Sequence, residues 1–253
     1  MATPAFPDHF SAVAGNYADF RPSYPPALFS WLAAITPGHT LAWDCAAGSG
    51  QASVDLARRF DRVVATDASA RQIGAARPHP KIEYRVAPAE ASGLADASVD
   101  LLAVAQALHW FDLDRFYAEA RRVLKPSGIL AAWTYGVLLL DDPEIDRRVQ
   151  AFYGGTVGPY WPPERHHVET GYRELAFPFP EIAAPPLRME TRWTLPQLLG
   201  YFRSWSATAR FVADRGDDPV AELAAGLAPS WGDPEQPHAI AWPLSLRIGR
   251  KPA

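Results

Sequence analysis

A turn of small residues follows an acidic residue early in the chain. Asp44 lies near the end of an apolar run over residues 40–45. Three small residues shape the turn that follows it: Ala46, Gly48 and Gly50. Small residues let the backbone bend tightly and let a ligand approach the main chain. Because a carboxylate also accepts hydrogen bonds and attracts positive charge, the stretch predicts a binding site for a small cofactor.

Two classes of cofactor bind at such turns, and they need different surroundings. A dinucleotide needs bare N–H groups, supplied by the pattern G-x-G-x-x-G, for its pyrophosphate. Here Ser53 stands in place of the third glycine, and no Lys or Arg occurs over residues 41–57. S-adenosylmethionine carries a sulfonium cation and no phosphate, so its site needs acceptors such as Asp44. The charges favour this cofactor, with an NAD(P)-dependent oxidoreductase as the alternative.

Two more acidic residues follow later strands. Asp67 comes directly after the predicted strand at 62–66, which lies beside the first strand, so its carboxylate can accept both ribose hydroxyls of either cofactor. Glu90 follows the strand at 81–87, where its side chain could meet the edge of adenine. As alternatives, Asp67 would cap the next helix and Glu90 would be an ordinary exposed side chain.

His109 follows the predicted strand at 99–105 and is expected to face the ligand crevice. It could be a general base or a hydrogen-bonding group for a methyl acceptor, or it could pack against Trp110. Methyl transfer to a carboxylate needs no base, because that acceptor is already an anion. Positioning would then supply most of the catalysis.

Other basic side chains carry weaker signals. Arg203 and Arg210 are candidates for binding an anionic acceptor. As an alternative, the aromatic segment that carries them, residues 201–211, would pack in the core without contacting a ligand. His166 and His167 are adjacent and have no Cys or carboxylate at ligand spacing. We therefore expect no metal site.

Apolar runs alternate with amphipathic segments over the first half of the chain. The predicted strands cover residues 40–45, 62–66, 81–87, 99–105 and 129–135. The predicted helices cover residues 27–35, 51–60, 69–76 and 113–124. This order indicates a doubly wound α/β fold with a parallel sheet. The strand at 99–105 is apolar nearly throughout, which predicts a central position with both faces covered.

Aromatic residues and prolines become dense after residue 135. We expect an insertion with helices at 143–152, 196–206 and 219–227 and a strand at 188–194. A final strand is predicted at 239–250, where Pro243 indicates a bulge or an edge. The chain is interpreted as a single domain over residues 1–253. Its parts are an N-terminal arm and helix (1–37), a cofactor-binding sheet core (38–135), a substrate-side insertion (136–237) and the final strand (238–253).

Composition narrows the class of protein. The 253 residues are 48% hydrophobic and 21% charged, enough to bury a full core. The net charge of -4, without a run of Lys or Arg, argues against nucleic-acid and membrane partners and favours a small-molecule substrate. Cys45 is the only cysteine, and the first residues lack the pattern of a signal peptide, so a cytoplasmic location is expected. The oligomeric state stays open.

Five segments, taken in order, resemble class I S-adenosylmethionine-dependent methyltransferases of the type 11 group. They are residues 44–50, 66–67, 89–90, 99–111 and 122–128. Residues 17–25, 106–111 and 242–250 are also similar to the branch that contains trans-aconitate methyltransferase-like proteins. The resemblance implies a seven-stranded, mainly parallel sheet whose last two strands, near residues 188 and 239, form an antiparallel hairpin at one edge.

The resemblance also implies roles for individual residues. The cofactor would be held by Asp44, Ala46, Gly48, Gly50, Asp67, Ala68, Ala89, Glu90, Gln106, Tyr17 and Arg21. The acceptor would meet Tyr24, His109, Trp110, Arg203 and Arg210. Tyr17, Arg21 and Tyr24 would form a lid over the cofactor, or else belong to an ordered N-terminal arm that packs on the helices. Gln106 would lie beneath the sulfonium and methionine.

The implied activity is methyl transfer to a small molecule, with a carboxylate suggested by the branch. A non-catalytic protein that binds S-adenosylmethionine is a further alternative. Ala46 departs from the family pattern, which has glycine at this position. Either the alanine methyl narrows the methionine pocket, or the turn avoids a positive φ there.

Overall fold

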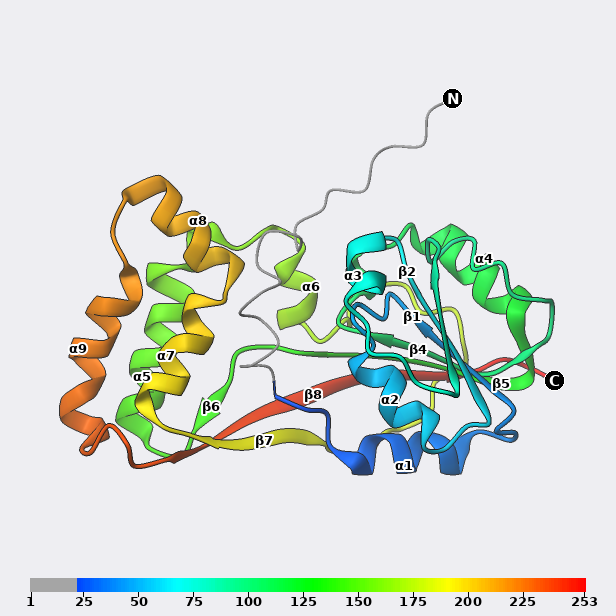
Figure 1. Cartoon of the computed structure of the whole chain (residues 1–253), viewed down its shortest axis with the longest axis horizontal. Helices are drawn as coiled ribbons and strands as arrows, with labels where there is room; N and C mark the ends of the chain where they lie inside the picture. The colour runs from blue at the N-terminus through cyan, green and yellow to red at the C-terminus, as the bar shows by residue number, and fades with distance from the viewer. Residues whose placement is uncertain (1–21) are drawn as a thin grey trace.

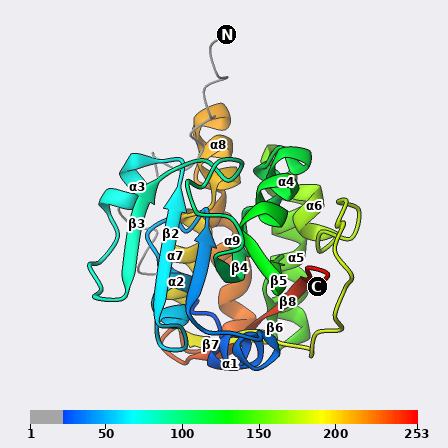
Figure 2. The same cartoon turned by 90° about the vertical axis from the view of Figure 1, so that its right-hand side faces the viewer.

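The computed structural model describes residues 22–253, and a mixed sheet forms its centre (Figure 1). Its strands are β1 (Leu41–Cys45), β2 (Arg62–Asp67), β3 (Ile82–Val86), β4 (Val99–Ala105), β5 (Leu124–Tyr135), β6 (Leu139–Leu140), β7 (Arg188–Trp193) and β8 (His238–Arg250). Strands β1 to β5 are parallel and follow the order β3-β2-β1-β4-β5, as Figure 2 shows. The strand order reverses between β1 and β4, so the ligand crevice of such a fold lies at the carboxyl ends of these two strands.

Helices cover both faces of the parallel strands, as predicted. The first four are α1 (Pro26–Ile35), α2 (Gln51–Ala57), α3 (Ala70–Gly74) and α4 (Leu113–Val123). Leu28, Leu32 and Leu56 from α1 and α2 pack against one face of the sheet. Phe116 and Val123 from α4 pack against the other. Six of the seven residues of β4 are buried, which confirms its predicted central position.

The antiparallel edge is built around β8. Its second half pairs with β5, from Leu244 opposite Tyr135 to Arg250 opposite Ile129. Its first half pairs with β7 from His238 to Pro243. Pro243 therefore lies where β8 changes from one neighbour to the other, a position that tolerates a residue without an N–H. The two-residue strand β6, which the sequence did not predict, adds an eighth strand beside β8.

A helical part lies at the other end of β7 and β8 (Figure 1). Its elements are α5 (Pro143–Ala151), η2 (Phe152–Thr156), η3 (Gly158–Tyr160), α7 (Leu195–Arg203), α8 (Ser206–Arg215) and α9 (Pro219–Trp231). Helix α6 (Arg165–Glu169) lies between these helices and the sheet and contacts β5 (Figure 1). The predicted helices near α5, α7 and α9 are present. Helix α8 was missed because it buries only Ala207 and Thr208 and so has almost no apolar period.

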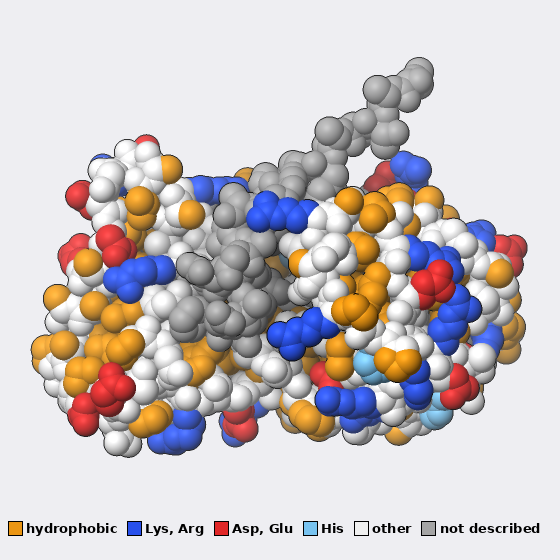
Figure 3. All heavy atoms as spheres, viewed as in Figure 1, with side chains coloured by type: hydrophobic (Ala, Val, Ile, Leu, Met, Phe, Trp, Pro, Cys, Tyr) orange, Lys and Arg blue, Asp and Glu red, His pale blue; other side chains and the backbone are white. Residues whose placement is uncertain are grey.

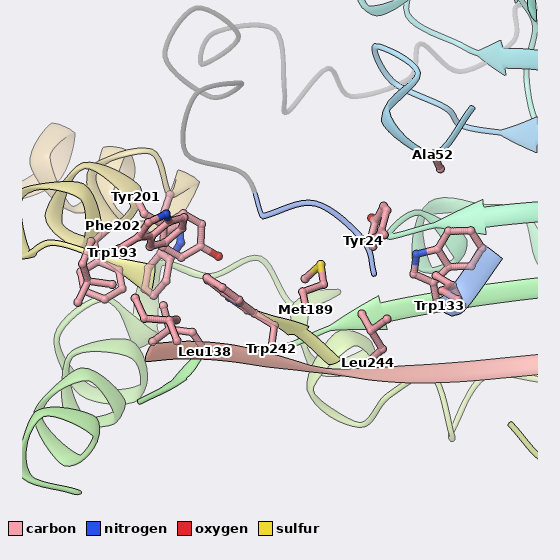
Figure 4. Packing of buried hydrophobic residues seen from close by; sticks show 14 of the residues in the cluster. Tyr24, Ala52, Trp133, Leu138, Met189, Trp193, Tyr201, Phe202, Trp242 and Leu244 are labelled. Atoms are coloured by element: carbon pink, nitrogen blue, oxygen red, sulfur yellow. The ribbon is translucent and has the colours of Figure 1, made fainter. Parts of the chain in front are cut away.

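One apolar cluster joins the helical part to the sheet. Figure 4 shows Met189 between the pair Tyr24 and Trp133, on the sheet side, and Trp242, on the helical side. The ring of Trp242 lies 5.2 Å from that of Trp193 and 5.7 Å from that of Tyr201. The helices are thus held over one end of the sheet by shared packing.

The described residues on one face of the molecule carry charges of both signs (Figure 3). On the face in Figure 3, Lys and Arg of the described residues are interspersed with Asp and Glu, without the continuous cationic band that nucleic acids require. None of the helices within residues 22–253 combines the length and the hydropathy needed to cross a membrane.

Candidate functional site

Asp44 lies in β1, directly before the turn of small residues, and is fully buried. Its Oδ2 accepts a hydrogen bond of 2.5 Å from Ser53 Oγ, whereas its Oδ1 is buried without a hydrogen-bond partner within residues 22–253. Burial raises the pKa of Asp44 to about 7, and the bond from Ser53 only partly offsets this. A buried acceptor without a donor fits a ligand that brings an N–H group or a positive charge.

The turn after Asp44 uses left-handed backbone at three positions. Gly48 and Gly50 have φ of +57° and +86°, which glycine adopts without strain. Ala46 has φ of +55°, so the alternative that the turn avoids a positive φ is wrong. The reason lies in the adjacent pairing, because Ala47 donates to the Thr66 carbonyl at 2.9 Å and pulls the chain toward β2.

Ala46→Gly is expected to raise the free energy of unfolding by about 0.5–1 kcal/mol. The strain of an L-residue at this φ costs about 1–2 kcal/mol, and the greater entropy of unfolded glycine offsets about 0.5–1 kcal/mol. Urea unfolding of the variant measures the difference. Ala151→Gly is the matched control, because Ala151 is exposed at φ -64° and should lose stability. Equal losses in both variants would contradict the assignment of strain to Ala46.

Asp67 is brought directly against the same turn. Its Oδ2 accepts from Gly48 N at 2.9 Å, and its Oδ1 accepts from Ser69 N at 2.8 Å. The carboxylate therefore fixes both the turn and the start of α3. Ala68 lies between Asp67 and Ser69, the residue that precedes α3. Each carboxylate oxygen retains a second lone pair. Asp67 can thus keep both bonds and accept ribose hydroxyls as well.

Tyr84 on β3 is a site residue that sequence reasoning missed. A Cβ added at Gly50 would lie 2.6 Å from Tyr84 Oη, so this hydroxyl sits against the turn. Tyr84 Oη is buried and has no hydrogen-bond partner within the described chain. Its pKa is raised by burial and by the charge of Asp44. No local motif marks Tyr84, because only the pairing of β3 with β2 brings it here.

The adenine candidates lie after β3. Ala89 is buried, and Glu90 accepts a hydrogen bond of 3.1 Å from the backbone N–H of Asp112. Asp112 in turn caps α4 by accepting from Arg115 N. Glu90 is thus tied to the start of α4, and its contact with adenine stays a prediction.

Gln106 directly follows β4, and its backbone is strained, with φ of +59°. Its Nε2 donates to the Tyr135 carbonyl at 3.1 Å, and its Oε1 accepts from Thr134 Oγ1. Its own N–H donates to the Trp133 carbonyl at 2.9 Å. These three bonds all join Gln106 to β5, and its place beneath the sulfonium and methionine stays a prediction.

His109 lies three residues further, on a short 3-10 helix. Its Nδ1 is 2.9 Å from Tyr172 Oη, and its ring is 4.7 Å from that of Trp110. Burial lowers the pKa of His109 to about 3, and the nearby charges of Arg165 and His167 act in the same direction. The ring is therefore neutral at neutral pH, and it is better suited to hydrogen bonding than to storing a proton.

The remaining predicted residues are spread more widely. Tyr24 is buried in edge-to-face contact with Trp133, at 5.6 Å. Arg203 pairs with Asp218, and Arg210 donates to the Tyr160 carbonyl; both lie on the outer helices. The structure does not bring these two arginines to His109, and their role as acceptor clamps stays a prediction.

The described part of the chain begins beside the cofactor turn. Tyr17 and Arg21 lie outside the described residues. The Pro22 carbonyl, the first described, accepts a hydrogen bond of 3.0 Å from Gln51 Nε2, at the first residue of α2. The chain therefore leaves the described region next to Gly50.

Arg165 was not singled out from the sequence, because its surroundings come from distant segments. Its guanidinium lies over the rings of Trp161 and Tyr153, at 4.7 and 5.4 Å, and its Nε donates to Tyr153 Oη. These residues line a cavity of about 300 Å³. Trp161 Nε1 and His167 Nδ1 are both buried without a partner in the described chain. Residues 22–253 hold no cluster of three His, Cys, Asp or Glu that could bind a metal ion.

The chain is similar to several known proteins. Residues 43–132 match the family model described as a methyltransferase domain. A candidate methyltransferase of Dictyostelium discoideum is 34% identical over 227 residues, which cover 88% of this chain and 86% of that protein. An uncharacterised methyltransferase of Mycobacterium tuberculosis is 38% identical over 122 residues, 48% of this chain and 49% of that one. The solved structure of a candidate type II methyltransferase from Anaeromyxobacter dehalogenans has a TM-score of 0.89 and 51% identity, covering 92% of this chain and 100% of that chain.

The fold, the turn and the similar proteins together identify the chain as a class I methyltransferase that uses S-adenosylmethionine. The chain belongs to this family and is a methyltransferase with S-adenosylmethionine as its cofactor. This decides against both alternatives, the NAD(P)-dependent oxidoreductase and the non-catalytic binding protein. The Oδ1 of Asp44, which has no partner among the described residues, and the open backbone at Gly48 fit that cofactor.

Proposed function

We propose that the enzyme methylates a small organic molecule that carries a carboxylate. The observation that supports this most is the Arg165 guanidinium, which is held over Trp161 and Tyr153 and whose charge reaches His109. A planar guanidinium with free N–H groups suits bidentate binding of a carboxylate. The buried Trp161 Nε1–H is a further donor without a partner in the described residues.

The chain's own residues would divide the work as follows. Asp44 and Asp67 would accept hydrogen bonds from the cofactor's amino and ribose groups, and Glu90 would border its adenine. S-adenosylmethionine supplies an activated methyl group on sulfur. Gln106 would lie beneath the methionine part, and His109 would accept a hydrogen bond from the acceptor. Catalysis would come mostly from in-line positioning and from exclusion of water.

The N-terminal segment would close the site as a lid through Tyr17, Arg21 and Tyr24. The bond from Gln51 Nε2 to the Pro22 carbonyl supports this, because Pro22 directly follows Arg21 and lies beside the cofactor turn. Closure over the cofactor would exclude water from the transferring methyl group.

Arg165→Gln is expected to raise KM for the acceptor at least tenfold and to leave binding of S-adenosylhomocysteine unchanged. A lost charge-assisted pair with a carboxylate is worth roughly 1.5–3 kcal/mol, of which 1.4 kcal/mol is tenfold. The acceptor is first found with labelled methyl donor and a panel of carboxylic acids, hydroxy acids, amino acids, phenols and amines. Arg188→Gln is the control, because Arg188 is an exposed β7 residue paired with Glu190. Equal turnover of an acid and its carboxamide would contradict the carboxylate.

A further inference from the structure

Helix α6 carries two opposite charges on one face, and both line the cavity beside Trp161. Arg165 and Glu169 are four residues apart, a spacing at which oppositely charged side chains on a helix commonly pair. Here they form no direct ion pair, because Tyr153 lies between them. Arg165 Nε donates to Tyr153 Oη at 2.8 Å, and Tyr153 Oη donates to Glu169 Oε1 at 2.6 Å. The cavity therefore presents a cation and an anion that one hydroxyl group holds apart.

The chemistry of the partners fixes the direction of both bonds. A guanidinium can only donate, and an ionised carboxylate can only accept. Burial raises the pKa of Tyr153 to about 12, so its hydroxyl keeps the single proton that it donates to Glu169. Tyr153 thus accepts from Arg165 and donates to Glu169, and it keeps the two charges separate at neutral pH.

Both charged groups retain capacity to bind a ligand. The terminal nitrogens of Arg165 and the second carboxylate oxygen of Glu169 have no hydrogen-bond partner among the described residues. Trp161 Nε1, in the same cavity wall, is buried and also lacks a partner there. His166 lines the cavity too, but its Nε2 is 2.7 Å from Glu174 and is already engaged. A guanidinium can bind a carboxylate through two parallel bonds, and a carboxylate can bind an ammonium group.

The backbone around Tyr153 supports a binding role. Residues Phe152–Thr156 form a turn of π-helix, a rare conformation that is frequent at functional sites. This turn places the ring of Tyr153 5.4 Å from that of Trp161. Gly154, from the same turn, lines the cavity, and a Cβ there would meet nothing within 4 Å. The volume of about 300 Å³ is within the range of small-molecule sites.

We propose that this cavity binds the zwitterionic head of an α-amino acid, with the carboxylate on Arg165, the ammonium on Glu169, and Tyr153 keeping these two side chains apart. The assignment rests on the proposed function, whose carboxylate it retains, and it adds a positive charge beside that carboxylate. An acid without an amine would bring its negative charge close to Glu169, and such repulsion disfavours the wrong ligand. An ammonium group has no lone pair, so the methyl would go to another nucleophile of the same molecule, on the side of His109.

Calorimetric titration tests the head group before any turnover is known. The protein loaded with S-adenosylhomocysteine is titrated with the standard amino acids and with their desamino counterparts. An amino acid is expected to bind about tenfold more tightly than its desamino counterpart, as the loss of one charge-assisted bond implies. Binding of no amino acid, or equal binding of the amino and desamino acids, would overturn the proposal.

Glu169→Gln removes the charge of this residue and keeps its shape. The glutamine carbonyl can still accept from Tyr153, so Arg165 should keep its place, whereas the ammonium group loses its partner. Affinity for the amino acid should fall about tenfold, and affinity for the desamino acid should stay level or rise. Glu144→Gln is the matched control, because Glu144 pairs with arginines of its own helix, α5. An unchanged preference for the amino acid in Glu169→Gln would overturn the proposal.

Tyr153→Phe tests the separation of the two charges. Without the hydroxyl, Arg165 and Glu169 can pair directly at their helical spacing, so amino-acid affinity should fall about tenfold. Tyr117→Phe is the control, since Tyr117 donates to the Ala176 carbonyl at 2.6 Å, away from the cavity. Wild-type affinity in folded Tyr153→Phe would overturn the role of Tyr153.

Two results distinguish failure of this proposal from failure of the proposed function. Equal binding of amino and desamino acids in the wild type, with both lost in Arg165→Gln, would remove the ammonium site and leave the carboxylate site standing. Equally tight binding of an amino acid and its carboxamide would remove both. A preference for the amino acid over each of these analogues is the expected result.

Discussion

Asp44→Asn is expected to weaken binding of S-adenosylhomocysteine by about 100-fold, since removing one partner of a buried charged pair costs roughly 2–5 kcal/mol. The free protein should be at least as stable as the parent, because the variant removes a buried carboxylate whose Oδ1 has no partner in the described chain. Calorimetric titration and thermal unfolding measure both effects. Asp55→Asn is the control, since Asp55 only pairs with Arg58 at the surface of α2. A less stable variant with intact binding would contradict the assignment.

The same residue should control the pH dependence of cofactor binding. The pKa of Asp44 is about 7 in the folded protein and 3.8 as the ordinary value. A cationic ligand binds the carboxylate form, so affinity should fall about tenfold for each pH unit below 7 and stay level above it. The stability of the ligand-free protein changes with pH in the opposite direction. Between pH 3.8 and 7, Asp44 carries a proton in the folded state but not in the unfolded state. The Asp44 contribution to stability therefore decreases as pH rises through that window and is constant above it.

Gly50→Ala is expected to reduce the free energy of unfolding by at least 2 kcal/mol and to abolish measurable cofactor binding. The new Cβ adds about 1–2 kcal/mol of strain at positive φ. It would also lie 2.6 Å from Tyr84 Oη and 2.8 Å from Tyr84 Cε1, so the Tyr84 ring would have to move. Urea unfolding and titration with S-adenosylhomocysteine give the two readouts.

Gly93→Ala separates strain from crowding. Gly93 has φ of +70°, and a Cβ there would meet nothing within 4 Å. The Gly93→Ala variant should therefore lose stability only through backbone strain, without a steric clash. Adding Tyr84→Phe to Gly50→Ala should recover part of the stability, because the hydroxyl is removed and the ring carbon stays. Equal losses in Gly93→Ala and Gly50→Ala would show that Tyr84 does not restrict the turn.

Local patterns predicted the parts of the fold and site that depend on nearby residues. One continuous segment contains the strand with Asp44, the turn to Gly50 and the helix that follows. The sequence therefore predicts these elements and their chemistry from neighbouring residues alone. Asp67 was predicted because neighbouring parallel strands end at one edge of a sheet, whereas Gln106 was implied by the family resemblance alone. The extra helix α8 and the strand β6 lacked any such period.

The missed residues have a common physical cause. Tyr84 reaches Gly50 through strand register, and Arg165 reaches Trp161 and Tyr153 through the packing of short irregular segments. Tyr172 meets His109, which lies 63 positions earlier in the chain, only after the intervening segments have folded. Residue type and spacing carry no information on such contacts, because many partners would satisfy the same polar atoms.

The long strand β8 also restricts how the two parts of the enzyme can move. It is hydrogen-bonded to β5 along one half and to β7 along the other, so sliding the helices along the sheet would break a whole ladder of bonds. Bending β8 at one point breaks far fewer hydrogen bonds than sliding does. Pro243 is such a point, because proline has no backbone N–H to donate to a neighbouring strand. Opening of the acceptor side should therefore be a rotation about this point, with the cofactor turn at rest on the stationary side.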